Sequence, residues 1–141
     1  MRPILLVEDN PMDVDLTIRA FAKRKLTNPV EVARDGEEAV ARIAGWDAGQ
    51  PLPVVILLDL KLPKVSGLEV LRTLKGHPVY KRIPVVVLTT SKEDADVNAA
   101  YDIGANSYIV KPVDFEKFME VAEQIEMYWG FVNTPTDEKC K

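Results

Sequence analysis

The stretch VVILLDLKLPKVSG, Val54 to Gly67, decides the fold prediction for this chain. Five apolar residues run without interruption from Val54 to Leu58, as in a strand that is buried on both faces of a parallel sheet. A carboxylate, Asp59, follows at once. A carboxylate at the end of a buried strand is either held by partners or placed to react, and the rest of the chain has to decide between the two.

Similar short apolar runs alternate with helical patterns along the whole chain. The predicted strands are Ile4–Val7, Val30–Ala33, Val54–Leu58, Val85–Leu88 and Tyr108–Val110. The predicted helices are Met12–Lys25, Glu37–Ala44, Leu68–Gly76, Glu93–Ile103 and Phe115–Trp129. This alternation predicts an α/β fold: a doubly wound, five-stranded parallel sheet with right-handed crossovers and helices on both faces. We expect one domain, residues 1–132, followed by a polar tail, residues 133–141.

Local signals mark several ends of these elements. Asn10 before Pro11 predicts a cap at the start of the first helix. Ser91 with Asp94 three residues later resembles a capping box. The second strand is followed by Arg34-Asp35-Gly36, which we interpret as a plain turn, and Trp46 is placed in a loop or at the rim.

Composition limits the function. The net charge of -4, without a long basic block, argues against nucleic acid and against an anionic membrane surface as partners. The single cysteine, Cys140, excludes an intrachain disulfide, and no apolar run approaches the ~20 residues of a membrane span. We therefore expect a cytoplasmic protein.

Polar side chains follow four of the predicted strands. Glu8 and Asp9 follow the first strand, Asp59 the third, Thr89 the fourth and Lys111 the fifth. Because the carboxyl ends of parallel strands meet at one edge of the sheet, these residues are expected to converge there.

Crowded carboxylates repel one another unless a cation and a nearby lysine relieve the charge. Ligands that are all oxygen, without His or Cys, favour Mg²⁺, and Lys111 adds a point charge for an anionic group. A carboxylate in this setting can accept a phosphoryl group, which makes Asp59 a reacting residue. Each residue alone also has a structural interpretation, with Asp9 as a helix cap and Lys111 as a surface residue. Their coincidence at four strand ends favours the site.

Four segments in this order resemble a response regulator receiver domain of two-component signalling, over about Pro3 to Tyr128. They are ILLVEDNP from Ile4, VVILLDLKLPKVSGLEVL from Val54, IPVVVLTTS from Ile83 and GANSYIVKP from Gly104. The resemblance implies the flavodoxin-like strand order 2-1-3-4-5. It also implies that Asp59 is the phosphoryl acceptor and that Glu8, Asp9 and Asp59 hold Mg²⁺ together with the Lys61 backbone carbonyl.

The resemblance further assigns a conformational switch to Thr89 and Tyr108 and phosphoryl binding to Lys111. It implies a cis peptide bond between Lys111 and Pro112. Lys61 and Ser91 occupy positions that vary within the family and influence how long the phosphoryl group persists.

The segments EDNPMDVDL and LDLKLPKVSG and the extended last helix resemble stand-alone regulators that partner phytochrome-type histidine kinases. We expect such a kinase and a downstream protein as partners, and no enzymatic output. Aromatic residues near the end of the last helix, Tyr128, Trp129 and Phe131, form either a homodimer contact or a flap on the monomer. Two alternatives remain: a flavodoxin-like electron carrier, disfavoured by the acids after the first strand, and a phosphohydrolase with an aspartyl nucleophile.

Overall fold

Five strands and five α-helices alternate along the computed structural model of the chain, which describes residues 2–112 and 114–132. The strands are β1 (Ile4–Val7), β2 (Val30–Ala33), β3 (Val55–Leu58), β4 (Val85–Thr89) and β5 (Ser107–Val110). The helices are α1 (Pro11–Lys23), α2 (Gly36–Asp47), α3 (Gly67–Lys75), α4 (Asp94–Ile103) and α5 (Phe115–Val132), with a short 3₁₀ helix η1 (Tyr80–Arg82). The predicted alternation of strands and helices is confirmed.

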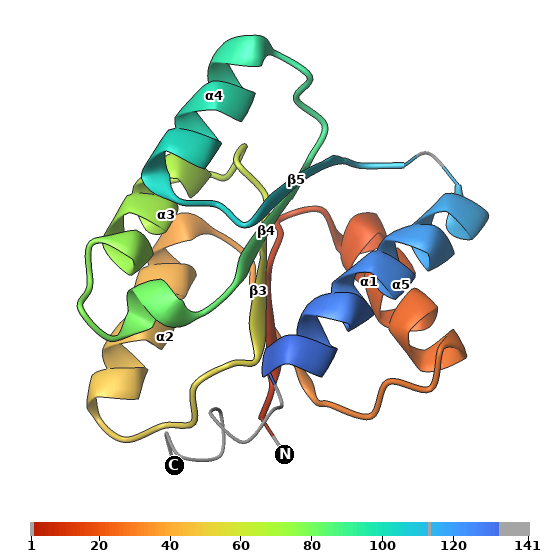
Figure 1. Cartoon of the computed structure of the whole chain (residues 1–141), viewed down its shortest axis with the longest axis horizontal. Coiled ribbons are helices and arrows are strands. Elements are labelled where there is room, and N and C mark those ends of the chain that lie inside the picture. Colours follow the sequence, from red (N-terminus) through yellow and green to blue (C-terminus); the bar gives the residue numbers. More distant parts are fainter. Residues whose placement is uncertain (1, 113, 133–141) are drawn as a thin grey trace.

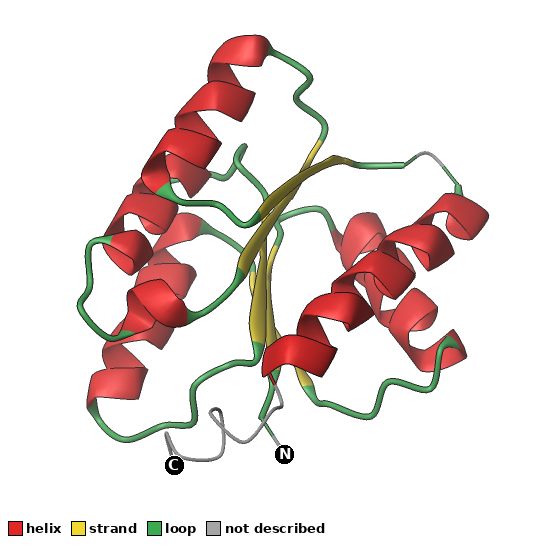
Figure 2. Cartoon of the chain, viewed as in Figure 1, coloured by secondary structure: helices red, strands yellow, loops and turns green. Residues whose placement is uncertain are grey.

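The strands form one parallel sheet in the order β2-β1-β3-β4-β5, as the resemblance implied. Helices α1 and α5 cover one face of the sheet and α2, α3 and α4 cover the other (Figure 1). Figure 2 shows the strands as a narrow central layer between these two layers of helices. The architecture is therefore the predicted doubly wound α/β fold.

Burial explains why the strands occupy these places in the sheet. Every residue of β1, β3 and β4 is buried, whereas β2 and β5, at the two edges, are mostly half-buried. Two hydrophobic cores result, one on each face of the sheet. Uninterrupted apolar runs thus form the centre of the sheet, because only a central strand is covered on both faces.

The start of α1 follows the predicted capping, but the start of α4 does not. The Asn10 side chain accepts a hydrogen bond from the Met12 backbone N–H. Helix α4 begins after Glu93, which makes no side-chain cap, and Ser91 donates its hydroxyl hydrogen bond to Asp96 instead of forming a capping box with Asp94. The capping-box prediction was wrong because Ser91 lies two residues before the cap position.

Trp46 is buried, so its placement in a loop or at the rim was wrong. It lies in the last turn of α2, with 7% of the residue exposed, and its ring meets the edge of the Tyr80 ring at a centroid distance of 5.1 Å. Ala39, Ile43 and Trp46 share the buried side of α2. The predicted helix ended at Ala44, but α2 continues to Asp47, because burial of the indole outweighs the low helix propensity of Gly45, about 1 kcal/mol.

In the part of the chain that the structure describes, no helix has the length and apolar character needed to cross a membrane. The predicted polar tail, residues 133–141, lies outside the described residues. The side chains of Tyr128, Trp129 and Phe131 are also outside the description, so the predicted homodimer contact stays a prediction.

Candidate functional site

The carboxyl ends of β1 and β3 bring three carboxylates together, as predicted. Glu8 and Asp9 follow β1 and Asp59 follows β3, and one carboxylate oxygen from each lies within 4.8 Å of the other two. Glu8 and Asp59 are buried and Asp9 is exposed. The cap role that Asp9 could have had is taken by Asn10, which leaves the Asp9 carboxylate to the cluster.

Lys111, just after β5, supplies the positive charge of the site. Its ammonium nitrogen lies 2.5 Å from Glu8 Oε1, 2.9 Å from Asp59 Oδ2 and 2.9 Å from Asp13 Oδ2, and only 6% of the side chain is exposed. Burial acts to lower the pKa of Lys111, but the hydrogen bonds to Glu8, Asp59 and Asp13 outweigh it and raise this pKa above the ordinary lysine value. Lys111 is therefore a charged ammonium, and the interpretation as a surface lysine is wrong.

Both carboxylate oxygens of Asp59 have partners. Oδ1 accepts a hydrogen bond of 2.8 Å from the Thr89 hydroxyl and one of 3.0 Å from the Lys61 backbone N–H, and Oδ2 accepts from Lys111. Thr89 is the last residue of β4 and is fully buried. The acceptor candidate is thus held by donors from its own loop and from two segments distant in sequence.

The carboxyl group of Glu8 has a strongly raised pKa. Burial raises the pKa of Glu8 to about 7, the hydrogen bond from Lys111 opposes this rise, and the negative charge of Asp59 adds to it. The Asn10 backbone N–H also donates to Glu8 Oε2 at 3.1 Å. A cation bound near Glu8 would oppose this rise in pKa, because it would stabilise the ionised carboxylate.

The balance of charge favours a divalent cation at this edge of the sheet. Four carboxylates, those of Glu8, Asp9, Asp13 and Asp59, face the single ammonium of Lys111. Carboxylate oxygens are the ligands that hard divalent cations take, so Glu8, Asp9 and Asp59 fit such an ion.

Of the two predicted switch residues, Thr89 contacts Asp59 directly and Tyr108 contacts the loop that follows Thr89. The Tyr108 hydroxyl donates a hydrogen bond of 3.0 Å to the Ser91 carbonyl, and the Tyr108 side chain packs against the core on the α4 side of the sheet. The predicted switch moves Thr89 toward a phosphoryl oxygen, after which Tyr108 could turn inward. In this structure Thr89 is hydrogen-bonded to Asp59 and Tyr108 is half-buried.

The predicted cis bond before Pro112 is absent. No cis peptide bond occurs in residues 2–112 or 114–132, so the Lys111–Pro112 bond is trans. The trans form is the more stable one before proline by about 0.5–1 kcal/mol, and Lys111 reaches all three carboxylates with it. The expectation rested on the resemblance alone.

Two contributions to the site were missed. Asp13, on the first turn of α1, holds Lys111. The turn after β2 also supports the loop that follows Asp59, since the Gly36 N–H donates to the Pro63 carbonyl and Lys64 pairs with Asp35. An added Cβ at Gly36 would lie 1.9 Å from the Val65 carbonyl oxygen, so only glycine allows this approach. The turn is therefore not the plain turn we predicted.

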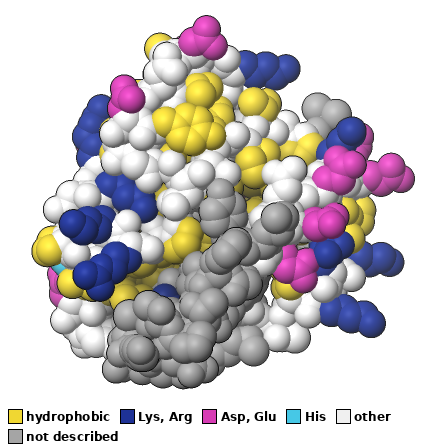
Figure 3. All heavy atoms as spheres, viewed as in Figure 1, with side chains coloured by type: hydrophobic (Ala, Val, Ile, Leu, Met, Phe, Trp, Pro, Cys, Tyr) yellow, Lys and Arg dark blue, Asp and Glu magenta, His cyan; other side chains and the backbone are white. Residues whose placement is uncertain are grey.

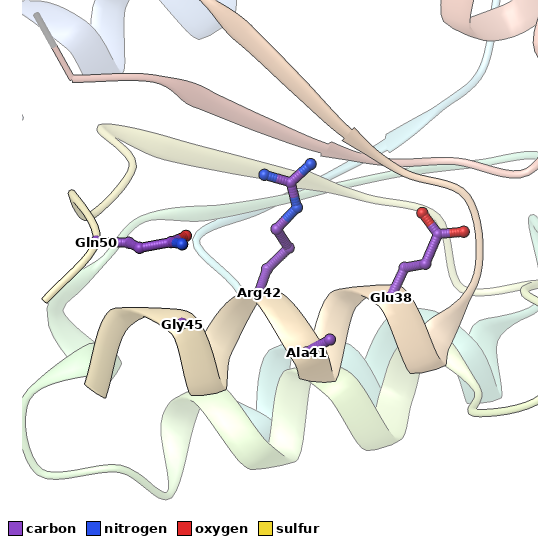
Figure 4. Close-up of a pocket in the computed structure, with 5 residues that line it drawn as sticks. All are labelled: Glu38, Ala41, Arg42, Gly45 and Gln50. Carbon is purple, nitrogen blue, oxygen red and sulfur yellow. The ribbon is translucent and has the colours of Figure 1, made fainter. Parts of the chain in front are cut away.

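A shallow pocket elsewhere carries no comparable chemistry. It is lined by Glu38, Ala41, Arg42, Gly45 and Gln50 (Figure 4). Glu38 and Arg42 project from α2 to the same side, and Arg42 is paired with Glu31 of β2. The pocket shares no residue with the acidic site, and we assign it no function.

The sheet order and the acidic edge with its lysine define a class of signalling protein, and comparison with known proteins gives the same class. The family model of the response regulator receiver domain matches residues 4–123, and the chain belongs to this family. It is therefore a response regulator of two-component signalling rather than an enzyme, a flavodoxin-like carrier or a phosphohydrolase.

Individual relatives show which kind of response regulator the chain resembles. The chain is 45% identical to the probable methanogenesis regulatory protein FilR2 of Methanothrix harundinacea, over 94% of this chain and 86% of the relative. It is 41% identical to the phosphorylated cyanobacterial phytochrome response regulator RcpA, with a TM-score of 0.84 and coverage of 94% and 96%. It is 40% identical to the response regulator Rcp1 of Synechocystis sp., over 89% of this chain and 87% of the relative. The predicted relation to phytochrome-associated regulators is confirmed.

Proposed function

We propose that Asp59 is the residue that accepts a phosphoryl group from a histidine kinase. The observation that carries the proposal is the pairing of the buried Asp59 carboxylate with Lys111 and Thr89 at the carboxyl edge of the sheet. An oxygen of Asp59 attacks phosphorus of the phosphohistidine, the phosphorus–nitrogen bond breaks, and the histidine nitrogen leaves with the bonding electrons. The product on this chain is an aspartyl-phosphate.

Lys111 and Thr89 then have defined tasks. The ammonium of Lys111 offsets the charge of about -1.5 to -2 that a phosphoryl group adds, and the Thr89 hydroxyl can turn its hydrogen bond from Asp59 to a phosphoryl oxygen. Both groups are already within hydrogen-bond distance of Asp59, so little rearrangement is needed before transfer.

We propose Mg²⁺ as the cation of the site. Glu8, Asp9 and Asp59 would hold it, with the Lys61 backbone carbonyl as the further ligand that the resemblance implies. When bound, Mg²⁺ supplies positive charge that stabilises the transferring group. A solved structure of the Mn²⁺-bound form of Rcp1 is similar to this chain with a TM-score of 0.82. That similarity supports a divalent cation in this site.

The kinase partner that we propose is of the phytochrome type, because RcpA is a phytochrome response regulator. The output that we propose is a contact with a downstream protein on the face of α4 and β5. Hydrophobic side chains gather over these elements in Figure 3, and Tyr101 and Val110 are among the exposed ones. This face adjoins Tyr108, whose backbone N–H donates to the Tyr101 hydroxyl.

Phosphorylation of Asp59 is tested with acetyl phosphate and Mg²⁺, followed by intact mass measurement. The parent chain is expected to gain one phosphoryl group, and Asp59→Asn none, because an amide is too weak a nucleophile. Asp15→Asn, an exposed aspartate on α1, is the control for the same loss of charge and is expected to label like the parent. Equal labelling of Asp59→Asn would refute the assignment, and full labelling in excess chelator would refute the need for a divalent cation.

A further inference from the structure

Asp13 holds the lysine of the site without belonging to its candidate metal ligands. Its Oδ2 lies 2.9 Å from the Lys111 ammonium, and 22% of its side chain is exposed. The carboxylates close enough to share one cation are those of Glu8, Asp9 and Asp59. Asp13 is thus the Lys111 partner that stands outside this group.

An aspartate in the first turn of a helix also stabilises that helix through its dipole, whatever it contacts. Two observations go beyond this role. The N-terminus of α1 is already capped by Asn10, and the Asp13 carboxylate is turned to a buried ammonium 98 positions away in sequence. Asp15 on the same helix shows the ordinary alternative, since it is exposed and pairs with Arg19 one turn later.

We propose that Asp13 is a positioning residue for Lys111 and that its negative charge lowers the phosphoryl occupancy of Asp59. The inference rests on the proposed role of Asp59 as acceptor. Beyond that role, Asp13 would set how readily Asp59 gains the phosphoryl group and how long Asp59 keeps it.

The donors of Lys111 are all engaged by carboxylates of the site. An ammonium has three N–H donors, and here three carboxylates take them. An incoming phosphoryl oxygen has to share or displace one of these carboxylates. A bound cation would offset the charges of Glu8 and Asp59, whereas the Asp13 carboxylate lies outside the group that would hold it. Asp13 therefore competes with the phosphoryl group for Lys111 and repels it.

The experiment compares Asp13→Asn with the parent chain in acetyl phosphate and Mg²⁺. An amide keeps the shape and one acceptor oxygen for Lys111 but removes the charge. The half-saturating concentration of acetyl phosphate is expected to fall by about two- to tenfold, and the aspartyl-phosphate is expected to last longer by a similar factor. Asp13→Glu, which keeps the charge, should stay close to the parent.

Asp15→Asn is the matched control, because it removes the same charge from the same helix away from the site. Values for Asp13→Asn equal to those of Asp15→Asn would overturn the proposal. So would a loss of Mg²⁺ binding in Asp13→Asn as large as in Asp9→Asn, because Asp13 would then be a metal ligand. A parent chain that takes no label would refute the acceptor role of Asp59 and this inference with it, whereas a labelled parent with an unchanged Asp13→Asn would refute the inference alone.

Discussion

At the scale of the residue, the site is a set of buried carboxylates whose charge Lys111 neutralises only in part. Glu8 and Asp59 are 2% and 5% exposed, a degree of burial that carboxylates rarely have without partners. Lys111 provides a charged hydrogen bond to each of them. Among the described residues, no buried side-chain nitrogen or oxygen lacks a hydrogen-bond partner. Removing Lys111 would therefore leave two buried carboxylates without their counter-charge, which is destabilising.

The raised pKa of Glu8 predicts a pH dependence of stability in the metal-free protein. The pKa is about 7 in the folded state against an ordinary 4.5, so between these values the folded state binds more protons than the unfolded state. The contribution of Glu8 to stability is complete below pH 4.5 and is lost as the pH rises through 7. Relative to Glu8→Gln, the free energy of unfolding of the parent should fall by up to about 3 kcal/mol across this range.

Urea unfolding in excess chelator at several pH values measures this difference. Glu37→Gln, which removes an exposed carboxylate, is the control and should keep the slope of the parent. A parent and a Glu8→Gln variant with parallel pH profiles would show that Glu8 is ionised in the folded protein at neutral pH.

At the scale of the element, the loop between β3 and α3 depends on two close backbone approaches. The Gly67 N–H donates to the Leu60 carbonyl at 3.0 Å, and a Cβ at Gly67 would lie 2.2 Å from the Asp59 carbonyl oxygen. On its other side the loop contacts Gly36, which begins α2. Asp59 is thus positioned by the starts of two helices as well as by its own strand.

Gly67→Ala is expected to lower the free energy of unfolding by about 1–3 kcal/mol, because the new methyl group overlaps backbone atoms that cannot move aside cheaply. It should also slow phosphorylation by acetyl phosphate, since the carbonyl it displaces belongs to Asp59. Gly45→Ala is the matched control: its Cβ would meet only the flexible end of Gln50, and alanine is favoured in a helix by about 0.5–1 kcal/mol. Urea unfolding of both variants measures these changes in the free energy of unfolding. A Gly67→Ala variant as stable as the parent would contradict the close packing at Gly67.

At the scale of the whole molecule, the acidic site is connected to the face of α4 and β5. Thr89 contacts Asp59 from the end of β4, Ser91 follows in the next loop, and Tyr108 of β5 donates to the Ser91 carbonyl. A movement of Thr89 toward a phosphoryl oxygen therefore pulls on the loop that Tyr108 holds. Such coupling needs an element with two arrangements, and this loop is the candidate.

Thr89→Ala tests the coupling. The variant should still accept a phosphoryl group, because Asp59 and Lys111 remain, but phosphorylation should no longer change the hydrogen exchange of α4 and β5. Thr90→Ala, a change at the exposed neighbouring residue, should respond like the parent. If phosphorylation alters exchange in Thr89→Ala as it does in the parent, the two regions are coupled by another route.

The sequence by itself determined the elements, their class of fold and most of the site. Apolar runs such as Val55–Leu58 identify central strands because full burial requires them, and polar residues that end parallel strands must share one edge. For this reason the sequence predicted one site with five members, Glu8, Asp9, Asp59, Thr89 and Lys111.

Only the tertiary structure decided which side chains meet across long stretches of chain. The contact of Asp13 with Lys111 spans 98 positions and depends on how α1 is rotated on the sheet, which no local pattern reports. The docking of Gly36 against Val65 and the burial of Trp46 against Tyr80 likewise depend on how α2 packs on its neighbours. Periodicity predicts which face of an element is buried, but the partner of each residue on that face is set by the packing of the whole domain.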